Sequence, residues 1–348
     1  MVGESEVFVT IGRASRVRPA TIYDVAEAAG VSHQTVSRLL SGFKGIRPET
    51  RARVETAIAE LQYRPNPAAR SLKNGRTHRI GALTHDLTEV GPSKTIDGAS
   101  HGAHDAGYLL DVVSIDPRDP HAIEQAIQIL RQQELAGVMV FAAADAVAAA
   151  VEPAGFAVPV VVDAELEEAQ YAAPATPNGR GSEMLVEHLF RLGHRNFLHL
   201  AGPREWVSAR NRVVAYTRAL EARGLISCGV LDGDWSAASG YTAGHRIPLD
   251  GSVTAVLASN DQMALGVIRA VTERGIRVPD DISVVGFDDI PEAAYFRPSL
   301  TTVSVDIDRG RAAIARLIAQ IEDRGAATDL NDRGPRLRVR ESSGPAPR

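Results

Sequence analysis

Four hydrogen-bonding side chains, His33, Gln34, Ser37 and Arg38, gather at the start of a short predicted helix. Guanidinium, amide, imidazole and hydroxyl groups can read base edges in the major groove of DNA; arginine favours guanine and glutamine favours adenine. Helix-turn-helix proteins present such side chains near the N-terminal end of their second helix. The spacing therefore predicts a surface that contacts DNA bases. The alternative is a small helical bundle whose polar face is only solvated.

Residues 21–40 predict the two short helices that would carry this surface. Thr21 can cap the first helix, with Asp24 at its third position in a weak capping box. Gly30 lies where the chain must turn with little room for a side chain. Ser32 can cap the second helix. The two helices would pack their apolar sides together, as helix-turn-helix units do.

A third helix is predicted from Pro48 to about Gln62, with proline at its first position. Val54, Ala57 and Leu61 recur at helical spacing and would face the first two helices. Arg47, directly before the proline, lacks a short polar side chain to cap this helix. Residues 21–64 thus predict a three-helix headpiece.

Charge is distributed unevenly along the chain. Residues 1–80 hold 13 Lys and Arg against 7 Asp and Glu, a net charge of +6. Residues 81–348 hold 25 against 36, a net charge of −11. A basic segment that coincides with the predicted headpiece is what the electrostatic part of DNA binding requires.

The segment after the headpiece predicts a very short helix. Asn66 can cap it, and Pro67 can occupy its first position. A helix of this length is unstable in isolation, so we expect it to order only on a partner.

From Ile80 onward, strand-like apolar runs alternate with amphipathic helical segments, which predicts an α/β fold with parallel sheets. The runs begin near residues 80, 109, 137 and 158 in a first set, and near residues 196, 253, 282 and 301 in a second. Two α/β lobes account for these two sets.

Ligands bind at the carboxyl ends of strands in open parallel sheets, so we take the polar and aromatic residues after these runs as candidate contacts. They are His85, Asp163, Trp206, Trp235, Asn260 and Asp288. Carboxylate and amide groups suit a polyhydroxylated ligand, and tryptophan can stack on the apolar face of a sugar ring. The alternatives are that Asp288 caps the next helix and that Asn260 stabilises a turn.

Two patterns suggest other chemistry. Gly98, Ser100 and Gly102 spell G-x-S-x-G, but a nucleophile elbow needs a strand before the serine, whereas residues 93–107 predict one helix. Three residues on the same helix could be metal ligands: His101, His104 and Asp105. A simpler interpretation is that they lie on a solvent-exposed face of the helix. We therefore expect neither an enzyme nor a cofactor.

The chain lacks the marks of export or membrane insertion. No apolar run approaches the ~18 residues of a membrane span. The first 18 residues hold no continuous apolar segment, and Cys228 is the only cysteine. These features favour a soluble cytoplasmic protein over an exported solute-binding protein.

Several motifs resemble one family of regulators. YDVAEAAGVSHQTVSR, PETR and YRPNPAARSLKNGRTHRIG resemble the start of the lactose-repressor/galactose-repressor family. GPREWVSARNR, GDWSAASGY, ASNDQMALG and VVGFDD resemble the segments that form its effector pocket. The resemblance runs from about Thr21 to about Ser343. It implies a helix-turn-helix headpiece, a hinge helix and a two-lobed core like a periplasmic binding protein.

The resemblance also implies domain boundaries. We expect a disordered extension over residues 1–20, the headpiece over 21–64, the hinge over 65–78, the core over 79–343 and a tail over 344–348.

Roles follow from the same resemblance. His33, Gln34 and Arg38 would face bases, and Thr21 and Ser32 would face phosphates. Ser37, Asn66 and Ala69 would complete the DNA contacts, and Leu72 would be a wedge in the minor groove that kinks the duplex. Arg212, Asn260 and Asp288 would hydrogen-bond the effector. Pro177 departs from the family, which often has aspartate there.

The sequence thus predicts a DNA-binding transcriptional regulator. We expect a repressor that binds a palindromic operator as a homodimer and responds to a mono- or disaccharide. A purine or nucleoside effector is the alternative. A solute-binding protein and an α/β hydrolase are remote alternatives.

Overall fold

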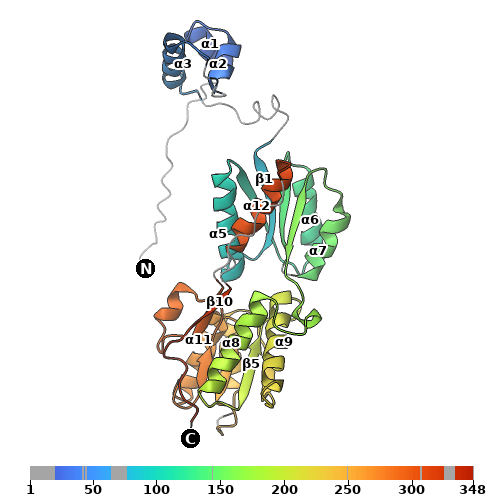
Figure 1. Cartoon of the computed structure of the whole chain (residues 1–348), viewed down its shortest axis with the longest axis vertical. Coiled ribbons are helices and arrows are strands. Elements are labelled where there is room, and N and C mark those ends of the chain that lie inside the picture. Colours follow the sequence, from blue (N-terminus) through green and yellow to red (C-terminus); the bar gives the residue numbers. More distant parts are fainter. Residues whose placement is uncertain are drawn as a thin grey trace, which may run out of the picture. The chain divides into compact units, whose positions relative to one another are not determined.

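The computed structural model describes residues 20–40, 43, 45–63, 77–142, 144–248, 250–305, 308–324 and 334–347. The chain divides into two compact units, Met1–Thr77 and His78–Arg348, which are described separately (Figure 1). Most of the expected N-terminal extension lies outside the described residues. So do Asn66, Ala69 and Leu72 of the expected hinge.

The first unit contains three helices, α1 (Ile22–Ala28), α2 (His33–Leu40) and α3 (Pro48–Glu60). The capping box at α1 is confirmed: the Asp24 amide donates to Thr21 Oγ1 (3.4 Å), and the Thr21 amide donates to Asp24 Oδ2 (2.6 Å). Ser32 Oγ accepts from the Thr35 amide (3.2 Å), so the predicted cap of α2 is also present. These caps set where both helices begin.

The turn and the small core of the headpiece also agree with the prediction. Gly30 has a φ of +62°, a left-handed conformation that favours glycine. Val25, Val36 and Val54, one from each helix, are fully buried against one another. Arg47 makes no side-chain cap at α3, and Pro48 begins that helix. The headpiece core is therefore held by all three helices.

The second unit begins with an upper lobe built on a parallel sheet in the order β2-β1-β3-β4. Its strands are β1 (Arg79–His85), β2 (Leu109–Ile115), β3 (Gly137–Ala142) and β4 (Val160–Ala164). Its helices are α5 (Val90–Asp105), α6 (Pro120–Arg131), α7 (Asp145–Val151) and, from later in the chain, α12 (Arg309–Ile321). Helices α5 and α12 cover one face of the sheet, and α6 and α7 cover the other (Figure 1).

The lower lobe repeats this plan with the strand order β6-β5-β7-β8. Its strands are β5 (Phe197–Ala201), β6 (Gly229–Asp232), β7 (Ala255–Ala258) and β8 (Ser283–Val285). Its helices are α8 (Pro177–Arg191), α9 (Val207–Glu221), α10 (Ala237–His245) and α11 (Asp261–Glu273). Short 3₁₀ turns lie at Glu152–Ala154, Glu168–Gln170 and Pro291–Ala294. Alternate residues of β7 point into two separate apolar clusters, as a strand buried on both faces requires.

The second set of strands differs from the prediction in two places. The run at residue 301 forms β9 (Thr302–Val305), which pairs antiparallel with β10 (Pro335–Arg338) as a separate two-stranded sheet. The fourth strand of the lower sheet is β6, which the sequence did not reveal. Between β9 and β10 the chain runs to α12 in the upper lobe, so both strands lie where the chain passes between the lobes.

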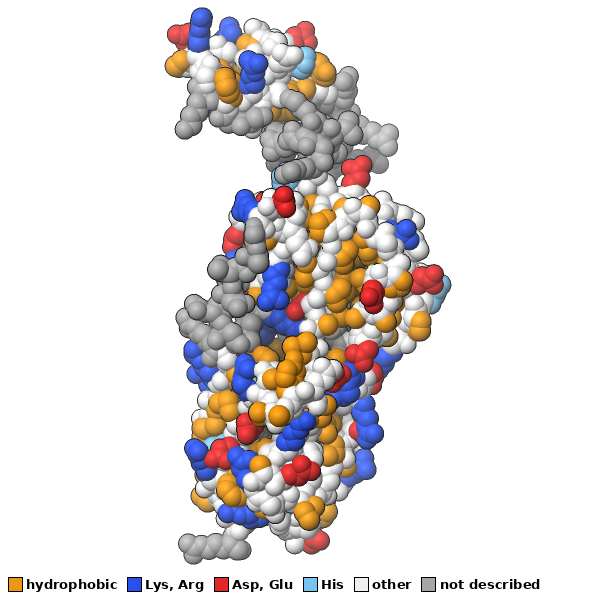
Figure 2. All heavy atoms as spheres, turned by 45° about the vertical axis from the view of Figure 1, so that its right-hand side comes forward, with side chains coloured by type: hydrophobic (Ala, Val, Ile, Leu, Met, Phe, Trp, Pro, Cys, Tyr) orange, Lys and Arg blue, Asp and Glu red, His pale blue; other side chains and the backbone are white. Residues whose placement is uncertain are grey.

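The C-terminal residues pack on the lower lobe. His194 Nε2 lies 3.0 Å from the Gly344 carbonyl, and the Ala346 amide donates to Leu192 (2.9 Å). The segment expected to be a tail is therefore anchored. None of the helices described has the length and apolar character needed to cross a bilayer. Acidic and basic side chains are interspersed over the face of the core in Figure 2.

Candidate functional site

The outer surface of α2 carries the side chains expected to read DNA. His33, Gln34 and Arg38 are exposed, and Ser37 is partly buried. Arg38 is exposed because the opposite side of α2, with Val36 and Leu39, packs in the headpiece core.

Two aromatic residues that the sequence analysis did not single out flank this surface. The Tyr23 ring lies 5.2 Å from the His33 ring and is 65% exposed. The Arg38 guanidinium lies 5.7 Å from the centre of the exposed Phe43 ring, within range of a cation–π contact. Both aromatic rings would help to orient the polar side chains beside them.

Thr21 and Ser32 lie at the N-terminal ends of α1 and α2, and their hydroxyls are used as caps. Thr21 Oγ1 also donates to Asp24 Oδ2 (2.7 Å). Backbone amides at a helix N-terminus attract phosphate. The expected phosphate contacts of both residues stay a prediction.

A cavity of about 680 Å³ lies between the two lobes of the core. The carboxyl ends of both parallel sheets open into it, where a ligand is expected in this kind of fold. All seven residues expected to bind an effector line it: His85, Asp163, Trp206, Arg212, Trp235, Asn260 and Asp288.

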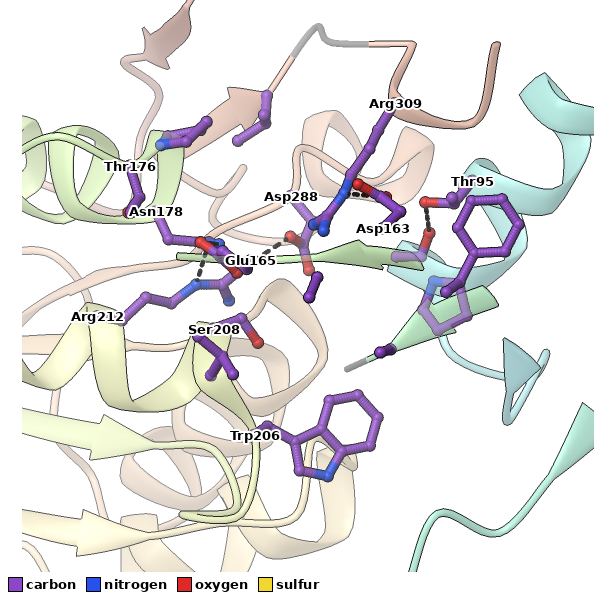
Figure 3. A pocket seen from close by; sticks show the side chains of 18 of the residues that line it. Thr95, Asp163, Glu165, Thr176, Asn178, Trp206, Ser208, Arg212, Asp288 and Arg309 are labelled. Carbon is purple, nitrogen blue, oxygen red and sulfur yellow. Dashed lines mark hydrogen bonds and ion pairs between the residues drawn. The ribbon is translucent and has the colours of Figure 1, made fainter. Parts of the chain in front are cut away.

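Arg212, from α9, lies at the centre of the polar wall of this cavity and is only 7% exposed. Its Nε donates to Asn178 Oδ1 (2.8 Å), and Asn178 Nδ2 donates to Glu165 Oε1 (2.6 Å). Its Nη2 lies 3.5 Å from Asp288 Oδ1 (Figure 3). One guanidinium therefore joins two carboxylates and an amide in one continuous group.

Burial governs the electrostatics of this group. Desolvation lowers the pKa of Arg212, and the Asp288 and Glu165 carboxylates oppose that shift. Desolvation raises the pKa of Asp288, and Arg212 and Lys94 oppose it. The neighbouring charges thus offset part of the cost of burying both ionised groups in the cavity.

A second polar pair lies across the cavity. Arg309 Nε, at the start of α12, donates to Asp163 Oδ2 (2.5 Å), beside the carboxyl end of β4 (Figure 3). This bond occupies one oxygen of the carboxylate that was expected to bind effector. The charge of Asp163 is therefore neutralised, and its other oxygen can still accept a hydrogen bond from a ligand hydroxyl.

Both tryptophans of the chain contribute to the aromatic wall. The Trp206 and Trp235 rings lie 5.8 Å apart in an edge-to-face arrangement, and the His85 ring lies 4.5 Å from Trp206. His85 Nδ1 and Trp235 Nε1 are buried and have no hydrogen-bond partner among the described residues. Burial lowers the pKa of His85 to about 4, so its imidazole is neutral at physiological pH.

Asn260 has a structural role beside its place in the cavity. Its Oδ1 caps α11 by accepting from the Met263 amide (2.9 Å), and its Nδ2 donates to the Trp235 carbonyl (2.8 Å). Asp288, by contrast, points toward Arg212 (Figure 3), and no side chain caps the 3₁₀ turn that follows it. Asn260 thus caps a helix instead of stabilising a turn, and Asp288 does not cap the helical turn that follows it.

The sequence analysis missed several charged residues of the cavity, because they lie outside strand ends. Lys94 Nζ, from the upper lobe, donates to the Asp288 carbonyl of the lower lobe (3.1 Å). Glu89 precedes α5, and its carboxylate makes no hydrogen bond or ion pair among the described residues. Desolvation, followed by the nearby Asp86 and Asp288 carboxylates, raises the pKa of Glu89 to about 7.

The G-x-S-x-G pattern has a packing explanation. Ser100 is exposed in the middle of α5 and does not directly follow a strand, since β1 ends at His85 and α5 begins at Val90. A Cβ atom at Gly98 would lie 2.0 Å from Asp308 Oδ1, and one at Gly102 would lie 2.6 Å from Ile314 Cγ2. The glycines let α5 and α12 approach closely. Among the described residues no cluster of histidine, cysteine and carboxylate side chains is arranged to hold a metal.

Together, the fold and the two sites define a DNA-binding transcriptional regulator with a helix-turn-helix headpiece and a two-lobed core. Residues 21–66 match the family model "Bacterial regulatory proteins, lacI family". Residues 186–343 match the model "Periplasmic binding protein-like domain". The chain belongs to the lacI family of bacterial regulatory proteins.

Known proteins resemble it over most of its length. The lactose operon repressor of Escherichia coli (strain K12) is 36% identical over 87% of this chain and 85% of that repressor. The HTH-type transcriptional repressor PurR of Klebsiella pneumoniae (strain 342) is 31% identical over 94% of this chain and 98% of that repressor. A crystal structure of the lac repressor dimer bound to operator and the anti-inducer ONPF superposes with a TM-score of 0.83, at 34% identity, and covers 94% of this chain and all of that one.

Proposed function

We propose that the protein is a transcriptional repressor whose affinity for its operator is controlled by a small carbohydrate. The observation that carries this proposal is the group of linked polar side chains around Arg212, which lines one cavity together with two tryptophans. Paired guanidinium, amide and carboxylate groups can exchange hydrogen bonds with many hydroxyls, and indole rings pack on the apolar face of a sugar.

The pairing of charges favours a neutral ligand. Asp163 is neutralised by Arg309, and Asp288 by Arg212. Glu89, whose pKa is raised to about 7, and Lys94 line the same cavity with charges of opposite sign, so the lining has no large excess of either charge. A mono- or disaccharide without phosphate or carboxylate suits this arrangement.

A purine or nucleoside effector is the second candidate. The relative named PurR is 31% identical over 94% of this chain, and the tryptophan pair could also stack on a flat base. The two candidates differ in what they need from the polar wall: a sugar needs many hydroxyl partners, whereas a base needs a few partners in its own plane.

The DNA side of the proposal rests on the headpiece. Arg38 and Gln34 would read bases, and His33 and Ser37 would support them from the same surface. A homodimer would place two headpieces on a palindromic operator, as the lac repressor dimer in the superposed structure is bound to its operator. Leu72, by family resemblance, would enter the minor groove, so Leu72→Ala should weaken specific binding more than non-specific binding.

Effector and operator would be coupled through the arrangement of the lobes. Lys94 and Arg210 reach across the lobes to Asp288 and Asp145. A ligand that favours one lobe arrangement can shift the DNA-binding equilibrium by at most the free energy of that preference, and coupling free energies of about 1 to 3 kcal/mol are typical.

The test is a fluorescence-anisotropy titration of the full-length protein on DNA from upstream of its own gene, at fixed salt. The titration is repeated with mono- and disaccharides, purine bases and nucleosides. Tight sequence-dependent binding that a neutral saccharide changes would support the proposal. A response to purines alone would support the second candidate. Binding no tighter than to random DNA would overturn the assignment of the headpiece surface.

A further inference from the structure

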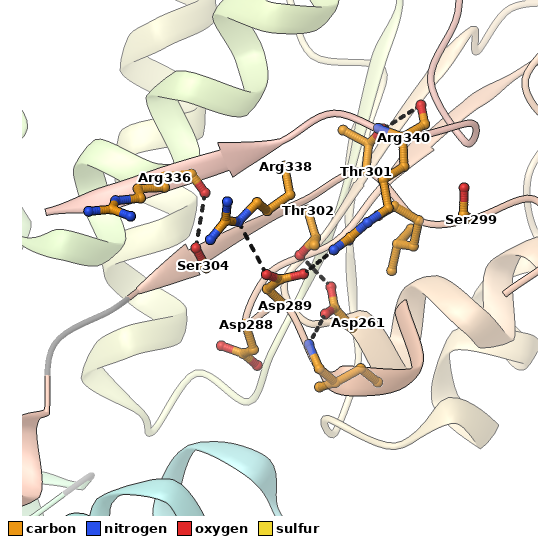
Figure 4. A network of polar contacts seen from close by, with 12 residues as sticks. Asp261, Asp288, Asp289, Ser299, Thr301, Thr302, Ser304, Arg336, Arg338 and Arg340 are labelled. Atoms are coloured by element: carbon orange, nitrogen blue, oxygen red, sulfur yellow. Dashed lines mark hydrogen bonds and ion pairs between the residues drawn. The ribbon is translucent and has the colours of Figure 1, made fainter. Parts of the chain in front are cut away.

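The loop after β8 holds two consecutive residues in an unusual backbone conformation. Asp288 has a φ of 104° and Asp289 a φ of 49°, both in the left-handed region. Non-glycine residues are unfavourable there and persist only where the surroundings hold them in place. This conformation lets neighbouring aspartates face different partners: Asp288 points to Arg212 in the cavity, and Asp289 points to the C-terminal segment (Figures 3 and 4).

Two arginines of the C-terminal segment bind Asp289. Arg340 Nη2 lies 2.7 Å from Asp289 Oδ1, and Arg338 Nε lies 3.4 Å from Asp289 Oδ2 (Figure 4). The Asp289 and Arg340 side chains are only 18% and 21% exposed, so solvent screens this pair weakly. Arg340 is itself fixed, because its Nη1 donates to the Leu300 carbonyl (2.8 Å).

The backbone around the two aspartates is also anchored. The Asp288 amide donates to the Val303 carbonyl of β9 (2.8 Å). The Ile290 amide donates to Asp261 Oδ2 (2.9 Å), and Asp261 Oδ1 accepts from Thr302 Oγ1 (2.6 Å). The loop is thus bound to β9 by its backbone, and to the end of β10 and the residues after it by the Asp289 side chain.

The residues that anchor this loop lie next to the segments in which the chain passes between the lobes. After β9 the chain runs to α12 in the upper lobe, and β10 begins where it has returned to pair with β9. Arg340 follows β10 by two residues. The loop that presents Asp288 to the cavity is therefore fastened to the segments that cross between the lobes.

We propose that Arg340 is a positioning residue of the effector site: its ion pair with Asp289 holds the left-handed loop that presents Asp288 to the cavity and couples this loop to the inter-lobe strands. The consequence for the effector rests on the proposed function. The positional claim does not, because it concerns the loop and its ion pair alone.

The tryptophans give a readout that needs no ligand. The chain has two, and both line the cavity. The Arg212 guanidinium lies 3.5 Å from Asp288 and 5.5 Å from the Trp235 ring, so a displaced Asp288 changes the surroundings of that indole. Tryptophan emission therefore reports on the loop.

The experiment compares Arg340→Met, Arg340→Lys and Asp289→Asn in the full-length protein. Methionine keeps an aliphatic stem without charge. Lysine keeps the charge. Asparagine tolerates a positive φ and removes the carboxylate. Arg277→Met is the matched control, because it removes an ion pair of similar length, Arg277–Asp281 at 2.6 Å, on the exposed surface of the same lobe.

Amide hydrogen exchange over residues 286–291 and tryptophan emission are measured for each variant. Arg340→Met and Asp289→Asn should speed exchange in this segment about tenfold and shift the emission. Arg340→Lys should retain most of the wild-type protection, and Arg277→Met should match wild type. If Arg340→Met does not fold, Asp289→Asn carries the test alone.

Wild-type exchange and emission in both charge-removing variants would overturn the proposal. Equal acceleration over the whole lower lobe would overturn it too, because that is the signature of a purely structural ion pair. If the loop loosens as expected while no saccharide or purine alters DNA binding, the positional claim stands and the proposed effector role fails.

Discussion

The Arg212 guanidinium lies 3.5 Å from the Asp288 carboxylate and 3.9 Å from the centre of the Phe287 ring. The cation is thus held between an aromatic face and a carboxylate in a nearly buried position. Removing one partner of such a pair leaves the other as an uncompensated buried charge. A ligand hydroxyl can donate to the carboxylate and accept from the guanidinium, so one sugar hydroxyl can bind both.

Removing the Asp288 carboxylate should therefore abolish the effector response. Asp288→Asn preserves a side chain that tolerates the φ of 104°, so it isolates the loss of charge. We expect effector affinity to fall by about 1.5 to 3 kcal/mol, the contribution of a hydrogen bond to a charged group, while operator affinity is kept. Asp288→Ala should leave DNA binding and remove the response. Anisotropy titrations with and without effector measure both. A normal response from Asp288→Ala would show that this cavity is not the effector site.

Arg38→Ala should relax base preference. A good bidentate contact to guanine contributes about 1 to 3 kcal/mol of discrimination against the other bases. The variant should therefore lose this discrimination at one base pair of each half-site and keep its base preference at the other positions. Binding to an operator and to its single-base variants measures the change. Arg131→Ala, an exposed arginine of α6, is the control and should bind as wild type. A uniform loss over all the DNA variants would instead assign Arg38 to a phosphate.

The local features that were predicted from the sequence depend on contacts between residues that are close together in the chain. The caps at Thr21 and Ser32 and the turn at Gly30 needed only neighbouring residues, and all three are present. The cavity residues after the strand ends were also placed correctly, because parallel strands end at one edge of a sheet. The four-residue strand β6 was not predicted, because buried and exposed residues alternate in it over too few positions to form a recognisable pattern.

Long-range contacts could not be predicted. Arg309 contacts Asp163 from 146 positions away, and Arg340 contacts Asp289 from 51 positions away. Each arginine looks like an ordinary surface residue in the sequence. Glu89 was missed for the same reason, because two of the carboxylates that raise its pKa, Asp288 and Asp234, belong to the other lobe.

Loss of the capping box should destabilise the headpiece. Thr21→Ala removes the oxygen that accepts from the Asp24 amide, and an N-cap of this kind contributes about 0.5 to 2 kcal/mol. Hydrogen exchange over residues 22–28 of the full-length protein measures the free energy of opening. Thr21→Ser keeps the hydroxyl and is the control. Equal protection in the alanine and serine variants would show that the cap contributes nothing to α1.

Glu89 should give the core a measurable dependence on pH. Its folded-state pKa is about 7, above the ordinary value of 4.5, chiefly because desolvation penalises the ionised carboxylate. Between these two values the folded state binds more protons than the unfolded state, so the free energy of unfolding should fall as pH rises from about 4.5 to about 7. Above about 7 the loss contributed by Glu89 is complete. Asp261, with a pKa of about 7, contributes in the same direction, so the two effects must be separated by substitution.

Glu89→Gln should flatten this slope, because glutamine has no proton to release. Denaturant unfolding of wild type and variant at pH 5 and pH 8 measures the difference. The variant should gain stability relative to wild type at the higher pH. Glu205→Gln, an exposed glutamate beside Trp206, is the control and should keep the wild-type slope. Parallel pH profiles for wild type and Glu89→Gln would mean that Glu89 titrates alike in the folded and unfolded states, so that burial does not raise its pKa.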